Sequence, residues 1–169
     1  MKRTVTALSL VTLIAAPALA AAETLHANLT GYQEVPAVST GASGEFRAKL
    51  NEAAGTIDYD LTYDGLESPV RMSHIHVAQP GVNGGISVWL CQTAAFPAPA
   101  PVFAVTPVCP QAGTVSGTIT AAQVIGPVPQ LIVATQLDEL IRAIRAGVTY
   151  VNIHSDGVPG GEIRGLLRR

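Results

Sequence analysis

Charge is the first thing that this sequence has little of. Only 13% of its 169 residues are charged, and ten Lys and Arg side chains stand against twelve Asp and Glu. Nucleic-acid-binding proteins usually carry a basic stripe, so this balance argues against nucleic acid as a partner. Aromatic residues are also few, at 5%, whereas Gly and Pro are plentiful with 16 and 12 copies. With little helical periodicity, this composition predicts an all-β domain with many turns.

Long apolar runs are lacking as well. The run from Val5 to Ala16 has about 12 residues, whereas a membrane-spanning helix needs about 20. It follows two basic residues and precedes a stretch of small ones, which is the pattern of a secretory signal peptide. We therefore expect residues 1–22 to be a leader, cleaved after Ala20 or Ala22. The domain over 23–169 would then be periplasmic or secreted, without a membrane span.

Cysteine occurs only twice, as Cys91 and Cys109. The two lie too far apart for the Cys-x-x-Cys spacing of a metal or redox pair. Because disulfides persist outside the cytoplasm, we expect the two to form one. The segment between them includes alternating Pro and Ala from Phe96 to Pro101, which favours an extended polyproline conformation. The bridge would tether this loop.

Alternating polarity predicts the strands. The runs 45–50 and 57–64 each place apolar residues at every second position, and the turn 51–55 between them predicts a hairpin with one buried face. Six further strands are expected at 24–30, 70–78, 86–91, 113–120, 148–154 and 162–167.

Helical spacing appears in only one place. Four apolar residues between Thr135 and Gly147 recur at intervals of three and four, and Thr135 with Asp138 has the spacing of a capping box. A shorter turn is possible at 120–123. The chain is therefore expected to fold as an antiparallel β-sandwich, Greek-key-like, with one short helix and a disulfide-tied loop.

Histidine is scarce, with four copies, yet three of them lie in two strand-like segments. His74 and His76 should share one face of a strand, roughly 7 Å apart, and His154 lies in a later strand. Imidazoles bind copper, zinc, nickel and iron. The interpretation that the histidines cap turns and bond to backbone carbonyls remains open.

Strand parity extends this candidate site. If the aliphatic sides of the strands face the core, the three histidines lie on outward faces together with Asn152, Glu162 and Arg164. These three side chains could orient the ligating histidines by hydrogen bonds, without contacting the metal. His26 is a possible fourth ligand, with copper the favoured metal and zinc the alternative.

Three motifs resemble the signature of the CHRD domain, a family named after chordin that also occurs in exported bacterial proteins. They are 31–36, then 74–78 with 81–84, and 150–154 with 159–165. The resemblance covers nearly all of the expected domain and implies an extracellular module. In chordin the module is repeated and belongs to a signalling antagonist. This chain has one copy and lacks the cysteine-rich partner domains, so growth-factor binding does not carry over.

A weaker resemblance is to copper/zinc superoxide dismutases, which are Greek-key sandwiches with a His-x-His pair and a later copper-binding histidine. Between Gly85 and Val151 there is no histidine, so only a copper-only version could apply. Binding is therefore favoured over catalysis. The favoured hypothesis is an exported metal-binding protein. The alternative is an extracellular protein-interaction module with structural histidines, and a copper-only dismutase-like enzyme ranks third.

Overall fold

The computed structural model of the chain describes residues 22–169, so almost all of the expected leader, 1–22, lies outside the described residues. Two α-helices, α1 (Ala100–Phe103) and α2 (Leu137–Arg145), and three single turns of 3-10 helix, η1 (Gly31–Gln33), η2 (Ala121–Gln123) and η3 (Val128–Gln130), join the strands. The strands are β1 (Glu23–Thr30), β2 (Ser43–Asn51), β3 (Thr56–Asp64), β4 (Val70–Val77), β5 (Gly85–Cys91), β6 (Gly113–Ile119), β7 (Thr149–Ser155) and β8 (Ile163–Leu166). All eight predicted strands are present.

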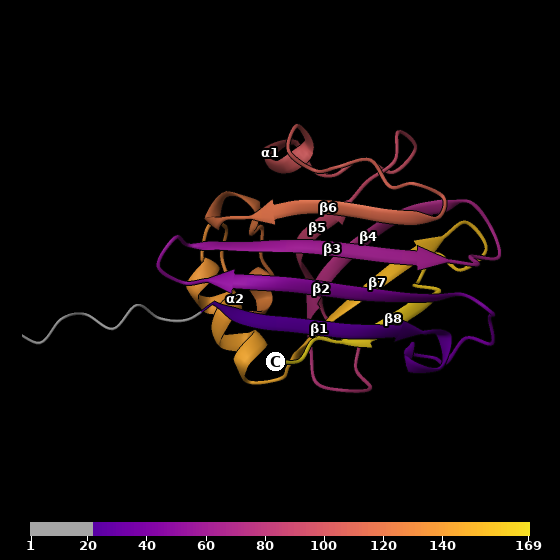
Figure 1. The fold of residues 1–169 in the computed structure, drawn as a ribbon, viewed down its shortest axis with the longest axis horizontal. Coiled ribbons are helices and arrows are strands. Elements are labelled where there is room, and N and C mark those ends of the chain that lie inside the picture. The colour runs from indigo at the N-terminus through magenta and orange to yellow at the C-terminus, as the bar shows by residue number, and fades with distance from the viewer. Residues whose placement is uncertain (1–21) are drawn as a thin grey trace, which may run out of the picture.

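The strands form one sheet in the order β5-β4-β7-β8-β1-β2-β3-β6, with every neighbouring pair antiparallel. Figure 1 shows the sheet folded into two layers, with β1, β2, β3 and β6 in front of β4, β5, β7 and β8. The Tyr59 hydroxyl of β3 donates to the Leu90 carbonyl of β5 across 2.6 Å, which joins the two layers. The nearly closed sheet confirms the predicted antiparallel sandwich-like architecture.

The front layer follows the sequence pattern closely. In β3 buried and exposed residues alternate along the whole strand, and β2 does the same from Phe46 onward. Phe46 pairs with Leu61 across the predicted hairpin, so its apolar face packs inward and its polar face meets solvent. The core between the layers is built from aliphatic and aromatic side chains such as Leu25, Leu29, Phe46, Leu50, Ile57, Leu61, Ile75, Val88, Leu90, Val151, Ile153 and Ile163.

The predicted helix is α2, which buries its four apolar side chains at one end of the sandwich. Its start differs from the expectation, because Gln136 is the N-cap residue and offers no side-chain cap, while Thr135 has a φ of 71°. A capping box occurs instead at Thr120, whose side chain accepts from Ala122 N–H while Gln123 binds back to the Thr120 N–H. That box opens η2, where a short turn was expected.

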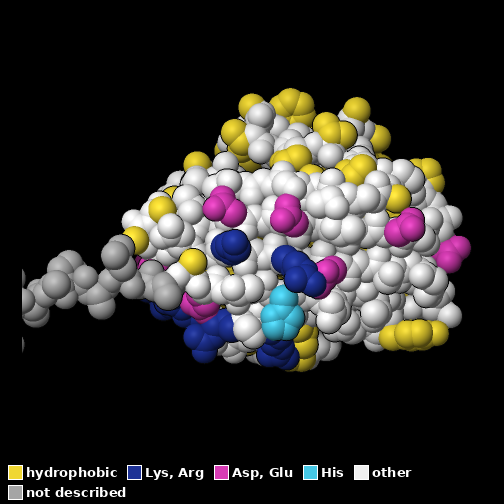
Figure 2. Space-filling view, viewed as in Figure 1, with side chains coloured by type: hydrophobic (Ala, Val, Ile, Leu, Met, Phe, Trp, Pro, Cys, Tyr) yellow, Lys and Arg dark blue, Asp and Glu magenta, His cyan; other side chains and the backbone are white. Residues whose placement is uncertain are grey.

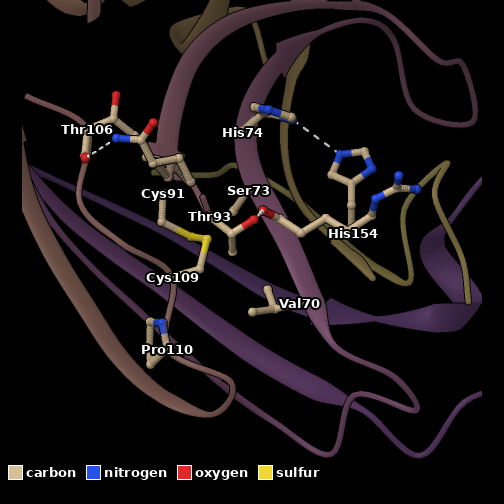
Figure 3. The surroundings of a disulfide bond; sticks show 12 residues. Val70, Ser73, His74, Cys91, Thr93, Thr106, Cys109, Pro110 and His154 are labelled. Atoms are coloured by element: carbon tan, nitrogen blue, oxygen red, sulfur yellow. Dashed lines mark hydrogen bonds between the residues drawn. A yellow bond between two sulfur atoms is a disulfide. The ribbon is translucent and has the colours of Figure 1, made fainter. Parts of the chain in front are cut away.

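The predicted disulfide joins Cys91 to Cys109 and ties the end of β5 to the segment that leads into β6 (Figure 3). The loop inside it is less extended than its proline content suggests, since α1 forms one helical turn directly after Pro99. The buried side chain of Gln92 holds the loop together. It accepts from Ala98 N–H and donates to the carbonyls of Phe103 and Thr106, each across 2.8 Å.

Within residues 22–169 no helix is both long enough and apolar enough to cross a membrane.

Candidate metal centre

The back layer is buried on both of its faces, unlike the front layer. Every residue of β7 is buried, as are the last five of β4 and the first three of β8. The histidines lie on the side of the strands that faces away from the aliphatic core, as strand parity predicts, but this outward side is covered: His74 is 1% exposed and His154 6%. Loops cover this face. Asn83 in one loop donates to the Val35 carbonyl in another, and the Arg164 guanidinium bonds to both Val82 and Asn83.

The three strand histidines meet on this covered face. Ring nitrogens of His74, His76 and His154 all lie within 4.8 Å of one another. The register explains the convergence, because β4 and β7 are adjacent and His74 lies opposite Asn152, two residues from His154. Side chains at such diagonal positions remain within reach across antiparallel strands. The shortest approach is 3.2 Å, between Nδ1 of His74 and Nε2 of His154.

Backbone carbonyls fix the tautomers of two of the rings. Nδ1 of His76 donates to the Gly84 carbonyl across 3.0 Å, and Nδ1 of His154 donates to the Pro159 carbonyl across 2.9 Å. Because a carbonyl oxygen can only accept, each Nδ1 carries the proton and each Nε2 is the acceptor. Within the described part of the chain the Nε2 of His76 has no hydrogen-bond partner, whereas the Nε2 of His154 can accept from Nδ1 of His74. Metal-binding histidines are typically oriented in this way by an acceptor behind the ring.

Two imidazole nitrogens at the centre have no partner. Nε2 of His74 and Nε2 of His76 are buried and without a hydrogen bond across residues 22–169. A buried polar atom without a partner costs about 1–3 kcal/mol. The purely structural interpretation, in which the rings satisfy themselves by bonding to carbonyls, accounts for the two Nδ1 atoms but leaves these Nε2 atoms unexplained.

All three imidazoles are held in the neutral form. Burial lowers the pKa of His76 to about 4, and burial together with the neighbouring histidines lowers the pKa of His74 well below its usual value. Burial also lowers the pKa of His154; the Pro159 carbonyl opposes this and the Arg71 charge adds to it. Neutral imidazole is the form that ligates metals, so the cluster is ready to bind at neutral pH.

Aromatic rings enclose the cluster. The Trp89 ring lies edge-on to His74 with 4.3 Å between centroids, and Tyr150 stacks on His76 at 4.7 Å with the planes 3° apart. On the far side of Tyr150, the Arg164 guanidinium lies 3.4 Å from the ring centroid. The column of imidazole, phenol and guanidinium locks the His76 ring in place.

The other predicted site residues are placed differently from one another. Oδ1 of Asn152 lies 3.1 Å from Nε2 of His154, whereas Arg164 packs on Tyr150 and its charge adds to burial in lowering the pKa of His76. Glu162 is fully buried but bonds elsewhere, accepting from the Thr40 and Ser155 hydroxyls and from Glu67 N–H. His26 is exposed on β1 in the front layer and is not part of the cluster.

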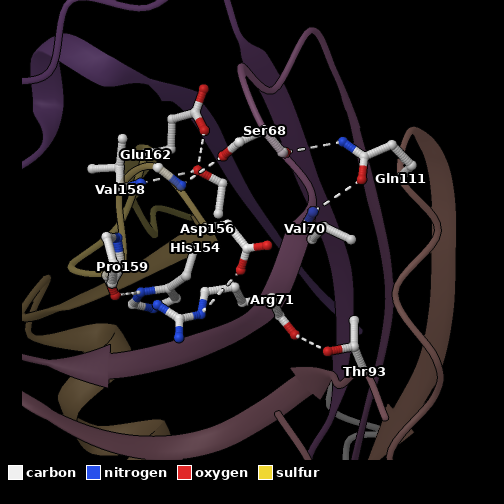
Figure 4. Close-up of polar contacts among 12 residues, drawn as sticks. Ser68, Val70, Arg71, Thr93, Gln111, His154, Asp156, Val158, Pro159 and Glu162 are labelled. Carbon is white, nitrogen blue, oxygen red and sulfur yellow. Dashed lines mark hydrogen bonds and ion pairs between the residues drawn. The ribbon is translucent and has the colours of Figure 1, made fainter. Parts of the chain in front are cut away.

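Two charged residues near the cluster were not predicted. Glu34 is 5% exposed, and burial raises the pKa of its carboxyl to about 7 against the influence of Val35 N–H, Arg164 and Asn152. Its place in the motif 31–36 was the signal that could have identified it. Arg71 lies beside His154 (Figure 4). Strand parity places Arg71 on the core side, and only the structure shows otherwise.

The three sequence motifs noted above meet at the covered face of the back layer. The first motif contributes Glu34, the second contributes His74 and His76, and the third contributes His154 and Arg164. The chain matches the sequence model of the CHRD domain over residues 25–167. It belongs to the CHRD domain family. Neither the curated proteins nor the solved structures contain a match to it.

The cluster of this CHRD domain has the donor set of a transition-metal site. Three nitrogen ligands suit copper or zinc, and two ligands on one tetrahedral ion with bonds of about 2.05 Å lie roughly 3.3 Å apart. Each of the three rings offers a nitrogen within 4.8 Å of the others, so modest ring movements would bring three nitrogens to that spacing. Three protein ligands would leave one position open.

Proposed function

We propose that this CHRD domain binds one transition-metal ion, with copper favoured, through His74, His76 and His154. The observation that carries the proposal is the convergence of three buried imidazoles, each with a ring nitrogen within 4.8 Å of the others, while Nε2 of His74 and Nε2 of His76 have no hydrogen-bond partner in the described chain. No carboxylate belongs to the cluster among residues 22–169.

Copper is favoured because divalent copper binds nitrogen sites more tightly than the other divalent metals of the first transition row. Zinc is the alternative, since three histidines and an open fourth position also suit its tetrahedral coordination. The proposed role is binding, and an enzyme would in addition need turnover that disappears when the ligands are replaced.

We further propose that the protein is exported and acts in the periplasm or outside the cell. The Cys91–Cys109 disulfide supports this, because such bonds persist where thiols are not kept reduced. The apolar run before residue 22 supports it independently. Mass spectrometry of the protein isolated from its host checks the leader: an intact N-terminus would overturn this part of the proposal.

The metal proposal is tested with untagged protein by adding copper or zinc and measuring bound metal after dialysis. Trp89 is the only tryptophan in the sequence and lies against His74, so its fluorescence reports binding directly. We expect one equivalent of copper, a clear preference over zinc, and strong quenching of Trp89. Uptake below one equivalent of either metal would overturn the proposal.

Variants locate the site. His76→Ala and His154→Ala should each weaken copper binding by 100-fold or more, because each removes one of three ligands. The matched control is His26→Ala, which removes the exposed histidine of the front layer and should leave binding unchanged. Circular dichroism verifies folding, and His74→Gln, which keeps a polar side chain of similar size, replaces any alanine variant that fails to fold. Equal affinities in all variants would contradict the assignment.

A second candidate function is protein interaction through the disulfide-tied loop. Figure 2 shows hydrophobic side chains gathered over this loop around α1, where Phe103, Val105 and Val108 are 53%, 56% and 74% exposed. A photo-crosslinking residue at position 103 in the producing cells tests it, with position 64 in the front layer as the control. A discrete adduct formed only from position 103 would support an interaction, and adducts from neither would overturn it.

A further inference from the structure

Arg71 is directed to the histidine cluster by an irregularity in β4. In the pairing of β4 with β7, Val70 lies opposite Ser155 and Met72 opposite His154, so Arg71 is an extra residue without a cross-strand partner. This is a β-bulge, and bulges redirect a side chain from the side that strand parity would give it. Figure 4 shows the Arg71 guanidinium lying beside the imidazole of His154.

The guanidinium is held in this place by two contacts. It lies over the Phe96 ring, 3.6 Å from the centroid, and its Nε forms an ion pair with the Asp156 carboxylate at 3.6 Å. That separation is too long for a hydrogen bond, and Nε is buried without a hydrogen-bond partner among residues 22–169. The Arg71 side chain is only 21% exposed, so its charge acts through a medium that screens poorly.

The charges around the cluster do not balance once a metal is present. Imidazole ligates in its neutral form, a divalent ion adds two positive charges, and Arg71 and Arg164 both lie near the rings. The acidic groups facing them are Asp156, whose side chain is 52% exposed, and Glu34, whose carboxyl is only partly ionised at neutral pH because burial raises its pKa to about 7. The loaded site would therefore carry a surplus of positive charge in a largely buried place.

We infer that Arg71 makes the open coordination position of the proposed metal centre a binding site for a small anion. The inference rests on the proposed metal site and deepens it. The anion would complete the coordination of the ion and offset the positive charge, while the planar guanidinium can donate two hydrogen bonds to it. His76 and His154 remain 7% and 6% exposed, so the cluster is not completely closed to solvent.

Azide is the probe, because its binding to divalent copper produces a charge-transfer absorption band. Copper-loaded protein is titrated with azide in chloride-free buffer, and copper affinity is measured separately by Trp89 fluorescence without azide. Arg71→Met keeps an apolar stem against Phe96 but removes the charge, and it should weaken azide binding at least tenfold. Arg71→Lys keeps the charge but loses the planar pair of donors, so its azide affinity should lie between those of the wild type and Arg71→Met.

Two further variants make the result specific. Asp156→Asn removes the acid that partly neutralises Arg71, so it should tighten azide binding several-fold, the opposite direction to Arg71→Met. Arg47→Met removes an exposed arginine of the front layer and should change nothing. If Arg71→Met does not fold, the azide affinities of Asp156→Asn and the wild type are compared, and tighter binding by Asp156→Asn supports the anion site.

The outcomes separate the two proposals. Copper binding with equal azide affinity in the wild type, Arg71→Met and Asp156→Asn would overturn the anion site and leave the metal site standing. Failure of the wild type to bind copper would overturn both. Copper affinity that is kept in Arg71→Met while azide affinity falls would support the anion site, because a merely structural role for Arg71 would weaken both.

Discussion

The two layers of this sheet differ in where their polar side chains lie. The front layer buries one face and exposes the other, and its charged side chains spread across the solvent side (Figure 2). The back layer buries both faces, so β7 has no exposed residue at all. Histidine, asparagine, glutamate and arginine side chains lie on its second face, beneath loops. On the exposed face of the front layer, water can hydrogen-bond to polar groups. In the back layer, the same groups are destabilising unless the protein supplies a hydrogen-bond partner.

This contrast explains where chemistry is available in the molecule. In the front layer, Asp58 and Asp60 accept from neighbouring hydroxyls and remain in contact with water. In the back layer, burial lowers the pKa values of three histidines and raises the pKa of Glu34. Perturbed ionisation of this kind is concentrated at functional sites in proteins.

The largest expected effect comes from removing a buried glutamate in the back layer. Glu162→Ala deprives the Thr40 and Ser155 hydroxyls and Glu67 N–H of their acceptor. Three hydrogen bonds of about 1.5 kcal/mol each are lost, so we expect the free energy of unfolding to fall by about 4.5 kcal/mol. Urea denaturation measures it.

The control is Glu45→Ala in the front layer, where the glutamate pairs with Arg47 at the surface. Its effect should be too small to separate from experimental error, because exposed ion pairs contribute little. Similar losses of unfolding free energy in Glu162→Ala and Glu45→Ala would mean that a buried glutamate of the back layer stabilises the fold no more than an exposed one of the front layer.

The next largest effect comes from the bond that links the edges of the two layers. Replacing Cys91 and Cys109 by alanine opens a loop with a sequence separation of 18 residues. The chain-entropy model assigns such a loop about 3 kcal/mol. Urea denaturation of the double variant, compared with the wild type with and without reductant, measures the loss. A double variant as stable as the oxidised wild type would show that Tyr59 holds the layers, and Gln92 the loop, without the bridge.

The difference between the layers also defines what could be predicted from the sequence. Alternation in 45–50 and 57–64 determined the front layer because one face is solvated there, and a period of two is then unambiguous. In the back layer the same parity correctly grouped His74 and His76 with His154. It could not predict burial, because the loops that cover this face are placed by tertiary packing.

The remaining differences have local causes. His26 was a candidate ligand because the place of its strand in the sheet was unknown, and the sheet order puts β1 in the other layer. Arg71 was missed because a bulge has no reliable signature in a single sequence. Glu162 lies on the predicted side of its strand, but three donors from other segments hold its carboxylate away from the imidazoles.

Glu34 tests the electrostatics of the covered face through pH. The folded carboxyl has a pKa of about 7 because of burial, compared with an ordinary value of 4.5. Between these pH values the unfolded chain is ionised while the folded one keeps its proton, so stability falls as pH rises through this window. Glu34→Gln mimics the protonated form and should stabilise the protein by about 2–3 kcal/mol at pH 8, with no gain at pH 4.

Urea denaturation of both proteins at the two pH values is the measurement. Asp60→Asn serves as the front-layer control, since Asp60 is exposed and accepts from Ser116. A gain for Glu34→Gln that is the same at pH 4 and pH 8 would contradict a titrating carboxyl as its source.

The smallest expected effect concerns a single hydroxyl. Thr149 in β7 is fully buried, and its Oγ1 has no hydrogen-bond partner within the described part of the chain. Thr149→Val keeps the shape and removes the unsatisfied atom, so it should stabilise the protein by about 1 kcal/mol. In the front layer, Thr62 Oγ1 pairs with Thr114 Oγ1 at 2.7 Å on the exposed face, and Thr62→Val should be neutral or slightly destabilising because water can replace the bond. Thermal unfolding of the two variants compares them directly. A loss of stability in Thr149→Val would mean that the back layer satisfies this hydroxyl through a bound water, and that its burial of polar groups is more complete than the contacts between its side chains suggest.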